Sequence, residues 1–433
     1  MGIRISTSTL FDQGIASIND RQRTMLEVQQ QVSTGRRVVT PSDDPIAAGR
    51  ILDLSQAQAL NQQFVENAAS ATASLATAEQ SLQGVIRALQ DVRTTIVNAG
   101  NATLGDSGRA ILARELRGSY QELLSFANAT DGQGNYLFSG YRGQTQPFSE
   151  ASPGDVQYAG DQGQRLLQVS ASRYVPVSDA GSEVFQRIRT GNGDFAATAG
   201  TANTGTGTIG IGAVSDPATW NATGNPSNFT IRFDVDTATN PATTTYDLVD
   251  NVSGNSLLTG AAASATGPYL RTFTPGAAID LRRQGAEPAF DYGATVTIQG
   301  NPGDADTFLL RQSPTQSVFS TVNNLVNALS TTISTASQSA RLTNDLGVAL
   351  ANIDQAIDRA LEVQTAVGAR MKEVDATAAT HADLAVQFEE TVSALRDVDY
   401  ARALSDLTLQ RTLLEAAQKS FVQVQNLNLF DLI

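Results

Sequence analysis

The chain has 433 residues, of which 29 are basic and 43 acidic, giving a formal net charge of −14. This balance lacks the basic footprint of a nucleic-acid-binding protein. Cysteine is absent and His381 is the single histidine, which excludes disulfides, thiolate metal sites and thiol nucleophiles. The first twenty residues lack the apolar core of a cleaved secretory signal, and no apolar run of about 18 residues could span a membrane. We therefore expect a folded protein that neither enters a membrane nor binds nucleic acid.

Short amphipathic segments lie at both ends of the chain. Their apolar residues recur at heptad spacing, which predicts helices with one apolar stripe. Each stripe is marginal alone because helix nucleation is costly and a single stripe has nothing to pack against. We expect these helices to be loose until they assemble with partners. The predicted coiled-coil positions are Phe11, Ile18, Met25, Val32, Leu407, Leu414, Ala417, Phe421 and Val424.

The segment TGRRVVTPSDDP, residues 34–45, follows the first of these helices. Gly35 is well placed to end that helix, and Asp44 followed by Pro45 is typical of the cap and first residue of the next one. Asp43 adds negative charge near the positive end of the helix dipole. Paired carboxylates can act as general acid and base, but the sequence gives no support for the pocket that this needs.

Capping leaves the two arginines of this segment unexplained. Their guanidinium groups suit bidentate pairing with carboxylates, within the chain or on a neighbouring subunit. We therefore interpret the segment as a structural joint. Its predicted residues are Arg36, Arg37, Pro41, Ser42, Asp43, Asp44 and Pro45.

Two long heptad seams occupy the two outer thirds of the chain. The first runs from Leu54 to Ile96, is interrupted only by Asn61, and predicts a helix roughly 65 Å long at 1.5 Å per residue. The second runs from Leu346 to Leu395 and includes His381. Two such seams at opposite ends of the chain predict that the helices pair with each other.

The middle of the chain, from residue 131 to about 313, is rich in Gly, Thr, Asn and Pro and contains short alternating runs such as FTIRFDV, residues 229–235. This is typical of turn-rich β structure. The predicted fold class is α+β, a long antiparallel coiled-coil rod from the N- and C-terminal regions with an inserted β-rich outer domain. The predicted domains are 1–44 with 400–433 (inner coiled-coil core), 45–139 with 316–399 (rod) and 140–315 (head).

Three short motifs resemble chemical sites. GTGTIG, residues 205–210, fits the dinucleotide pattern, but no hydrophobic strand precedes it and no helix follows, so a turn-rich loop is expected. His381 lies on a helix seam, where a histidine without further ligands or a positioned serine favours packing. DVD, residues 234–236, lacks the glycine and final glutamate of an EF-hand. We expect no enzyme activity, no cofactor and no metal.

Four segments resemble the flagellin superfamily, in particular its hook-filament junction members. They are RISTSTLFDQ at the start, QQQVSTGRRVVTPSDDPIAAGRIL (29–52), ANATDGQGNYLFSGYRGQTQPF (127–148) and LQRTLLEAAQKSFVQVQNLNLFDLI at the end. In the middle, VTIQGNPGDADTFLL (296–310) resembles a GxPxxGDxF turn of outer domains. It departs by having Asp304, Ala305 and Asp306 where Gly-Asp is usual.

The resemblance implies a structural subunit that passes unfolded through the flagellar type III channel without a cleaved signal. Outside the cell it would form a ring between the first hook-filament junction protein and the flagellin filament. Implied partners are those two proteins, further copies of the chain, and an export chaperone with the export apparatus. The resemblance also places residues 34–45 at the joint between the inner coiled coil and the rod.

Three other functions stay open at this point. Flagellin itself is the nearest alternative, because it shares the superfamily. An extracellular adhesin would use the β-rich head and would need an aromatic platform, for which Trp220, Phe229 and Tyr246 are the candidates. An enzyme is disfavoured by the missing cysteines and the lone histidine.

Overall fold

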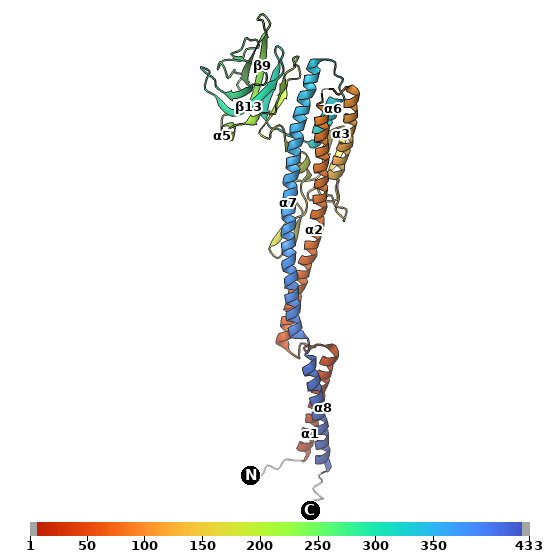
Figure 1. Cartoon of the computed structure of the whole chain (residues 1–433). Helices are drawn as coiled ribbons and strands as arrows, with labels where there is room; N and C mark the ends of the chain where they lie inside the picture. Colours follow the sequence, from red (N-terminus) through yellow and green to blue (C-terminus); the bar gives the residue numbers. More distant parts are fainter. Residues whose placement is uncertain (1–6, 102, 427–433) are drawn as a thin grey trace, which may run out of the picture. The chain divides into compact units, whose positions relative to one another are not determined.

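The computed structural model describes residues 7–101 and 103–426 (Figure 1). The chain divides into two compact units. The terminal unit consists of residues 1–69, 169–172 and 376–433, and the central unit consists of residues 70–168 and 173–375. Because these units cut across the three predicted domain ranges, the three-part division stays a prediction. Helices α2 (Pro45–Ala99) and α7 (Ala336–Arg396) contribute residues to both units.

In the terminal unit, α1 (Thr7–Thr34) and α8 (Tyr400–Asn426) lie side by side (Figure 1). The ring of Phe421 packs edge-on against Phe11, with 5.8 Å between ring centroids. It also fills a notch at Gly14, where an added Cβ would come within 2.6 Å of the ring. The stripes predicted at the two ends of the chain therefore pack against each other.

The seam positions of α2 and α7 are buried or half-buried. On α2 every predicted seam position from Ala68 to Ala99 is buried, and on α7 the buried positions include Ile353, Val367 and Val374. Two polar residues on the seams, Asn61 and His381, meet in the terminal unit. The Asn61 amide donates to the His381 carbonyl at 2.8 Å, and its oxygen lies 2.6 Å from the imidazole Nδ1. His381 is therefore a buried packing residue, as expected.

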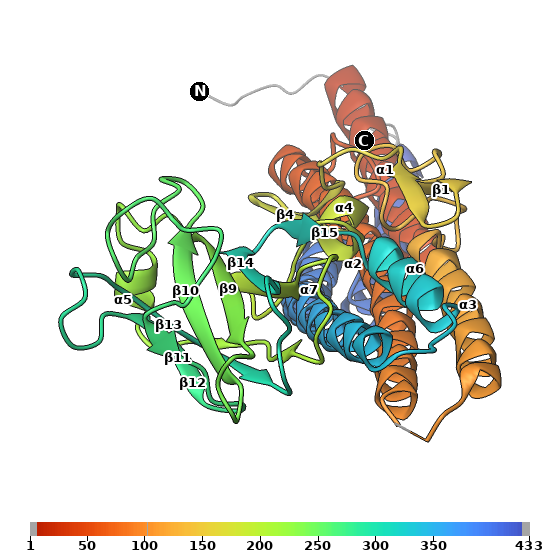
Figure 2. The ribbon, with the colours of Figure 1, turned by 90° about the horizontal axis from the view of Figure 1, so that it is seen from above.

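Two further helices pack in the central unit. Helices α3 (Asp106–Ala127) and α6 (Val318–Leu329) lie side by side (Figure 2). Tyr120 of α3 packs against Phe319 of α6, and Phe319 also contacts Phe148 at the start of the neighbouring strand. The short helices are α4 (Gly181–Phe185) and α5 (Pro217–Trp220).

Along the sequence, the β structure lies between the N- and C-terminal helical regions. Figure 2 shows its two main sheets. The larger sheet has the order β11-β10-β9-β14-β6; the second has the order β12-β13-β7, and β8 also pairs with β13. The strands are β1 (Phe148–Ser152), β2 (Asp155–Tyr158), β3 (Leu166–Ser170), β4 (Arg173–Pro176), β5 (Ile188–Arg189), β6 (Phe195–Ala199), β7 (Thr208–Ile209), β8 (Ala213–Val214), β9 (Asn228–Asp236), β10 (Thr243–Asp250), β11 (Arg271–Thr272), β12 (Ala278–Arg282), β13 (Asp291–Gln299), β14 (Thr307–Gln312) and β15 (Thr315–Gln316). The predicted α+β class, with terminal helices and a β-rich insertion, is confirmed.

The sheets enclose one aromatic core. Trp220, Phe229 and Tyr246 are 3%, 0% and 5% exposed and belong to this core. The aromatic platform considered for an adhesin is therefore wrong, because these rings pack into the core rather than lie on the surface. For Phe229 this follows from the alternating burial along β9.

The glycine-rich loop at residues 204–207 wraps around a carboxylate. Asp306 accepts backbone N–H bonds from Thr204 at 2.7 Å, Gly205 at 3.0 Å and Gly303 at 2.6 Å. These N–H donors are thus occupied by Asp306, the aspartate of the GxPxxGDxF pattern, and the departure from the pattern is Ala305 at the position of its second glycine. Ala305 has φ = +61°, a conformation that favours glycine.

Substituting Ala305 by glycine should stabilise the β structure. Removing the left-handed strain outweighs the greater chain entropy of glycine in the unfolded state, so we expect a gain of about 0.5–1 kcal/mol. Gly300→Ala is the matched opposite change, because Gly300 has φ = +74° and its added Cβ would lie 2.3 Å from the Thr206 carbonyl oxygen. Thermal melts of both full-length variants check this, and an Ala305→Gly variant that melts lower than the parent would contradict it.

Candidate assembly sites

The segment after α1 forms a backbone joint with the segment after α7. Helix α1 ends at Thr34, and Gly35 takes φ = +70°, the left-handed conformation of a helix end. The N–H of Arg37 donates to the Arg396 carbonyl at 2.6 Å, and the N–H of Val398 donates to the Gly35 carbonyl at 3.0 Å. Two connections far apart in sequence are therefore hydrogen-bonded to each other within the terminal unit.

The two arginines take different places in this joint. The Arg37 guanidinium donates to the Leu395 carbonyl at 2.8 Å and to Asp44 at 3.2 Å, so it links both connections. Arg36 instead forms a backbone bridge with Asp397. The pKa of Asp397 is lowered by hydrogen bonds from Arg396 and Ser393 and, more weakly, by the charge of Arg36.

The two aspartates organise the turn and the helix start separately. Asp44 accepts the N–H of Ala47 at 3.0 Å and so caps α2, whose first residue is Pro45. Asp43 accepts the N–H groups of Val39 and Thr40 at 2.9 and 2.7 Å. These contacts close the turn rather than cap the helix end.

The remaining predicted joint residues lie in that exposed turn. Ser42 and Thr40 are joined by a hydroxyl–hydroxyl hydrogen bond of 2.8 Å, and Pro41 lies between them. The structure thus brings all seven predicted joint residues together, except that only Arg37 of the two arginines pairs with Asp43 or Asp44.

The predicted coiled-coil positions of α1 and α8 are mostly half-buried in the single chain. Leu414 is buried; Val424 belongs to α8, but its side chain lies outside the described residues. The half-buried positions are Phe11, Ile18, Met25, Val32, Leu407, Ala417 and Phe421. The contact between α1 and α8 therefore covers these stripes only in part.

The sequence ATDGQGNYLFSGY folds into a tight polar turn in the central unit. The Asp131 carboxylate accepts the N–H groups of Gln133 and Asn135 at 2.9 and 2.8 Å. Gly140 has φ = +70°, and an added Cβ would lie 2.2 Å from a carboxylate oxygen of Asp161. Local hydrogen bonding thus explains Asp131 of this motif, and local packing explains Gly140.

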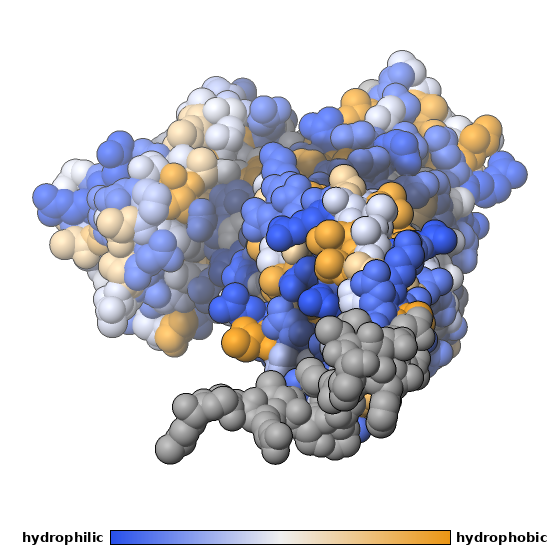
Figure 3. Space-filling model, turned by 90° about the horizontal axis from the view of Figure 1, so that it is seen from below, coloured by the Kyte–Doolittle hydropathy of each residue, from blue (hydrophilic) through white to orange (hydrophobic). Residues whose placement is uncertain are grey.

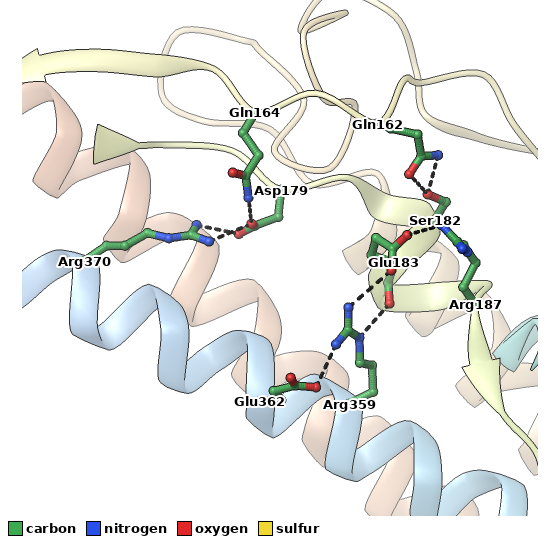
Figure 4. Close-up of polar contacts among 9 residues, drawn as sticks. All are labelled: Gln162, Gln164, Asp179, Ser182, Glu183, Arg187, Arg359, Glu362 and Arg370. Atoms are coloured by element: carbon green, nitrogen blue, oxygen red, sulfur yellow. Dashed lines mark hydrogen bonds and ion pairs between the residues drawn. The ribbon is translucent and has the colours of Figure 1, made fainter. Parts of the chain in front are cut away.

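A polar network that the sequence did not reveal fastens neighbouring loops to α7 (Figure 4). Arg370 makes a bidentate contact with Asp179 at 2.9 and 3.0 Å, and Gln164 donates to the same carboxylate at 2.8 Å. Arg359 donates to the Glu183 carbonyl at 2.9 Å and to Glu362 at 2.7 Å. One usable signal was the 11-residue spacing of the two arginines, which places them on one face of a helix.

These residues border a pocket of about 470 Å³. The charged groups around it pair with one another, and its lining includes the small apolar side chains of Ala180, Val184 and Ala366. Residues 7–101 and 103–426 contain no group of three His, Asp or Glu side chains able to hold a metal. Within the same residues, no helix combines the length and apolarity needed to cross a membrane.

Comparison with known protein families shows to which family the chain belongs. Residues 5–143 match the bacterial flagellin N-terminal helical region, and residues 350–433 match the bacterial flagellin C-terminal helical region. The chain belongs to the flagellin family. The two matched regions are the two helical regions that contain the joint and α1, α2, α3, α7 and α8.

Within the family, the chain is similar to flagellar hook-associated protein 3. It is 39% identical to that of Salmonella typhimurium and 40% identical to that of Escherichia coli, each over 186 residues, or 43% of this chain. The match spans 58% of the length of both relatives.

Solved structures point in the same direction. The crystal structure of the flagellar junction protein FlgL from Legionella pneumophila is 28% identical, with a TM-score of 0.68, covering 80% of this chain and 100% of that one. FlgL from Xanthomonas campestris is 30% identical, with a TM-score of 0.61, covering 73% and 92%.

Acid should open the turn of the joint. The pKa of Asp43 is lowered from 3.8, chiefly by the Thr40 N–H, and that of Asp44 chiefly by the Ala47 N–H and then by Arg37. Because both pKa values are lowered, the ionised carboxylates stabilise the folded joint fully above pH 3.8. This stabilisation is lost as the pH falls through the lowered pKa values.

NMR titration of the carboxyl groups in the full chain measures these two pKa values. The amide signals of Val39 and Thr40 report the protonation of Asp43, because both amides donate to its carboxylate. In Asp43→Asn those two amides should lose their acid transition, while Ala47, which binds Asp44, keeps its own. Midpoints at or above 3.8 for both aspartates would contradict the proposed hydrogen bonding.

Proposed function

We propose that the chain is a structural subunit of the bacterial flagellum that forms the junction between hook-associated components and the flagellin filament. It would be exported through the flagellar type III channel and act outside the cell, without enzyme activity. Similarity to hook-associated protein 3 and to FlgL supports this role over that of flagellin itself.

The observation that carries the proposal is the uncovered apolar surface of the terminal unit. This unit holds under a third of the chain but more than half of the large hydrophobic side chains exposed in the described residues. They are Ile15, Leu26, Ile46, Leu52, Leu60, Val386, Tyr400, Leu404, Leu409 and Val422. Figure 3 shows apolar groups scattered among hydrophilic ones on the face seen from below. Apolar surface gathered in one unit is expected of a chain that packs into an assembly.

The proposed partners follow from that role. They are the first hook-filament junction protein on one side, flagellin on the other, and further copies of this chain in a ring. An export chaperone and the export apparatus would handle the chain beforehand. A chain without cysteine suits unfolded passage through a narrow channel, because no disulfide can block it.

The joint at residues 34–45 would set the geometry of the terminal helices in the assembly. Arg37 supports this role because its guanidinium reaches Asp44 on one connection and Leu395 on the other. The exposed Arg36 is the more available of the two for a neighbouring subunit, since no ion pair to its side chain is recorded in the described residues.

Deleting the gene tests the proposed role directly. We expect hooks without filaments on the cell surface and abundant flagellin shed into the medium, because the filament would lack its adaptor. Electron microscopy of hooks and immunoblotting of the medium measure this. Hooks without filaments, together with loss of the major extracellular protein, would instead indicate that the chain is flagellin, the filament subunit. Normal filaments would contradict both the junction role and the flagellin role.

Reversing the joint charges should weaken assembly without unfolding the chain. In Arg36→Glu/Arg37→Glu, the contacts to Asp44 and Leu395 are replaced by repulsion, so filaments should detach more readily and motility should fall several-fold. Arg87→Glu/Arg114→Glu is the control, because it makes the same charge change at exposed positions of α2 and α3. Circular dichroism should match the parent for both variants. Unchanged motility and filament retention in the joint variant would refute its role.

A further inference from the structure

Helix α8 carries an exposed stripe on the face opposite its contact with α1. Successive members are three or four residues apart, which places them on one side of the helix. Leu409, near the middle, is 53% exposed, and basic residues stand at both ends. The α8 stripe consists of Arg402, Ser405, Leu409, Thr412, Ala416 and Lys419, all exposed.

Helix α7 carries a second exposed stripe within the terminal unit. It lies on the side of α7 away from the seam, and Val386, its large apolar member, is 59% exposed. Acidic residues flank this valine. The α7 stripe consists of Ala376, Ala379, Asp383, Val386 and Glu390, all exposed.

The charges of the two stripes are free to pair with outside groups. Among the described residues, no ion pair involves Arg402 or Lys419 on α8, or Asp383 or Glu390 on α7. By contrast, Arg411, also on α8, lies 3.8 Å from Glu415. The stripe charges are thus basic on α8 and acidic on α7, and each set surrounds an exposed apolar residue. The exposed Asp406 lies beside the α8 stripe and reduces its net positive charge without reversing it.

We propose that the α7 stripe of one copy packs against the α8 stripe of a second copy. The opposite charges give the pairing its polarity, and the small residues of both stripes allow the helices to approach closely. Because the two surfaces differ, the contact is heterologous and leaves one stripe of each copy open for the next. This inference rests on the proposed assembly role and names the surfaces by which copies meet.

Cysteine cross-linking tests the contact cleanly, because the chain has no cysteine of its own. Full-length Val386→Cys is mixed with full-length Ser405→Cys, Leu409→Cys or Thr412→Cys and oxidised. At least one mixture should form disulfide-linked dimers several-fold more than either variant alone. Mass spectrometry identifies the linked peptides. Cross-linking no greater than that of the separate variants, in all three mixtures, would overturn the proposal.

Charge reversal separates a specific contact from random collision. Asp383→Lys/Glu390→Lys in the Val386→Cys copy should reduce cross-linking several-fold, as should Arg402→Glu/Lys419→Glu in the copy that carries the α8 cysteine. Mixing the two reversed copies should restore it. Asp358→Lys/Glu122→Lys, which changes exposed acidic residues of the central unit, should have little effect.

A failure of rescue with all variants folded by circular dichroism would also refute this contact. The gene-deletion phenotype would be unaffected by that result. If the gene deletion causes flagellin to be shed but the cysteine variants show no specific cross-link, the junction role stands and only these two surfaces are rejected.

Discussion

The packing of helices from the two ends of one chain against each other is the constraint on which the structure depends. In the central unit the seam residues of α2 and α7 are large enough and buried enough to fill a core, as at Leu75, Leu82 and Ile353. In the terminal unit the same arrangement leaves most seam positions of α1 and α8 half-buried. A pair of helices has two outer faces that it cannot cover, so full burial of the terminal unit would require other chains, as the proposed assembly role supplies.

Local sequence rules predicted those features that depend on neighbours in the chain. The heptad repeat fixes which face of α2 is buried, and Asp44–Pro45 fixes where that helix begins. The same rules could not pair Asn61 with His381, because periodicity does not define the register of an antiparallel partner. Nor could they connect Arg370 to Asp179 or Arg37 to the Leu395 carbonyl, since these partners lie far away in sequence. Tertiary contacts of this kind carry no local signal.

The β structure contrasts with the terminal unit because its polar and aromatic groups are largely engaged internally. Asp306 accepts the backbone N–H groups of Thr204, Gly205 and Gly303. Arg271 pairs with Glu287 where both side chains are nearly buried. Its aromatic residues form the core rather than a binding platform. More than half of the large hydrophobic side chains exposed in the described residues lie in the terminal unit, whose helices fall within the family's two matched helical regions.

Hydrogen exchange of α1 and α8 tests this account most directly. Amide exchange measured by mass spectrometry would compare the free full-length chain with the same chain in isolated hook-filament junctions. Incomplete burial predicts fast exchange of both helices in the free chain and strong protection in the junction, with little change in the central seams. Equal protection of α1 and α8 in the two states would contradict the claim that the terminal helices complete their packing only on assembly.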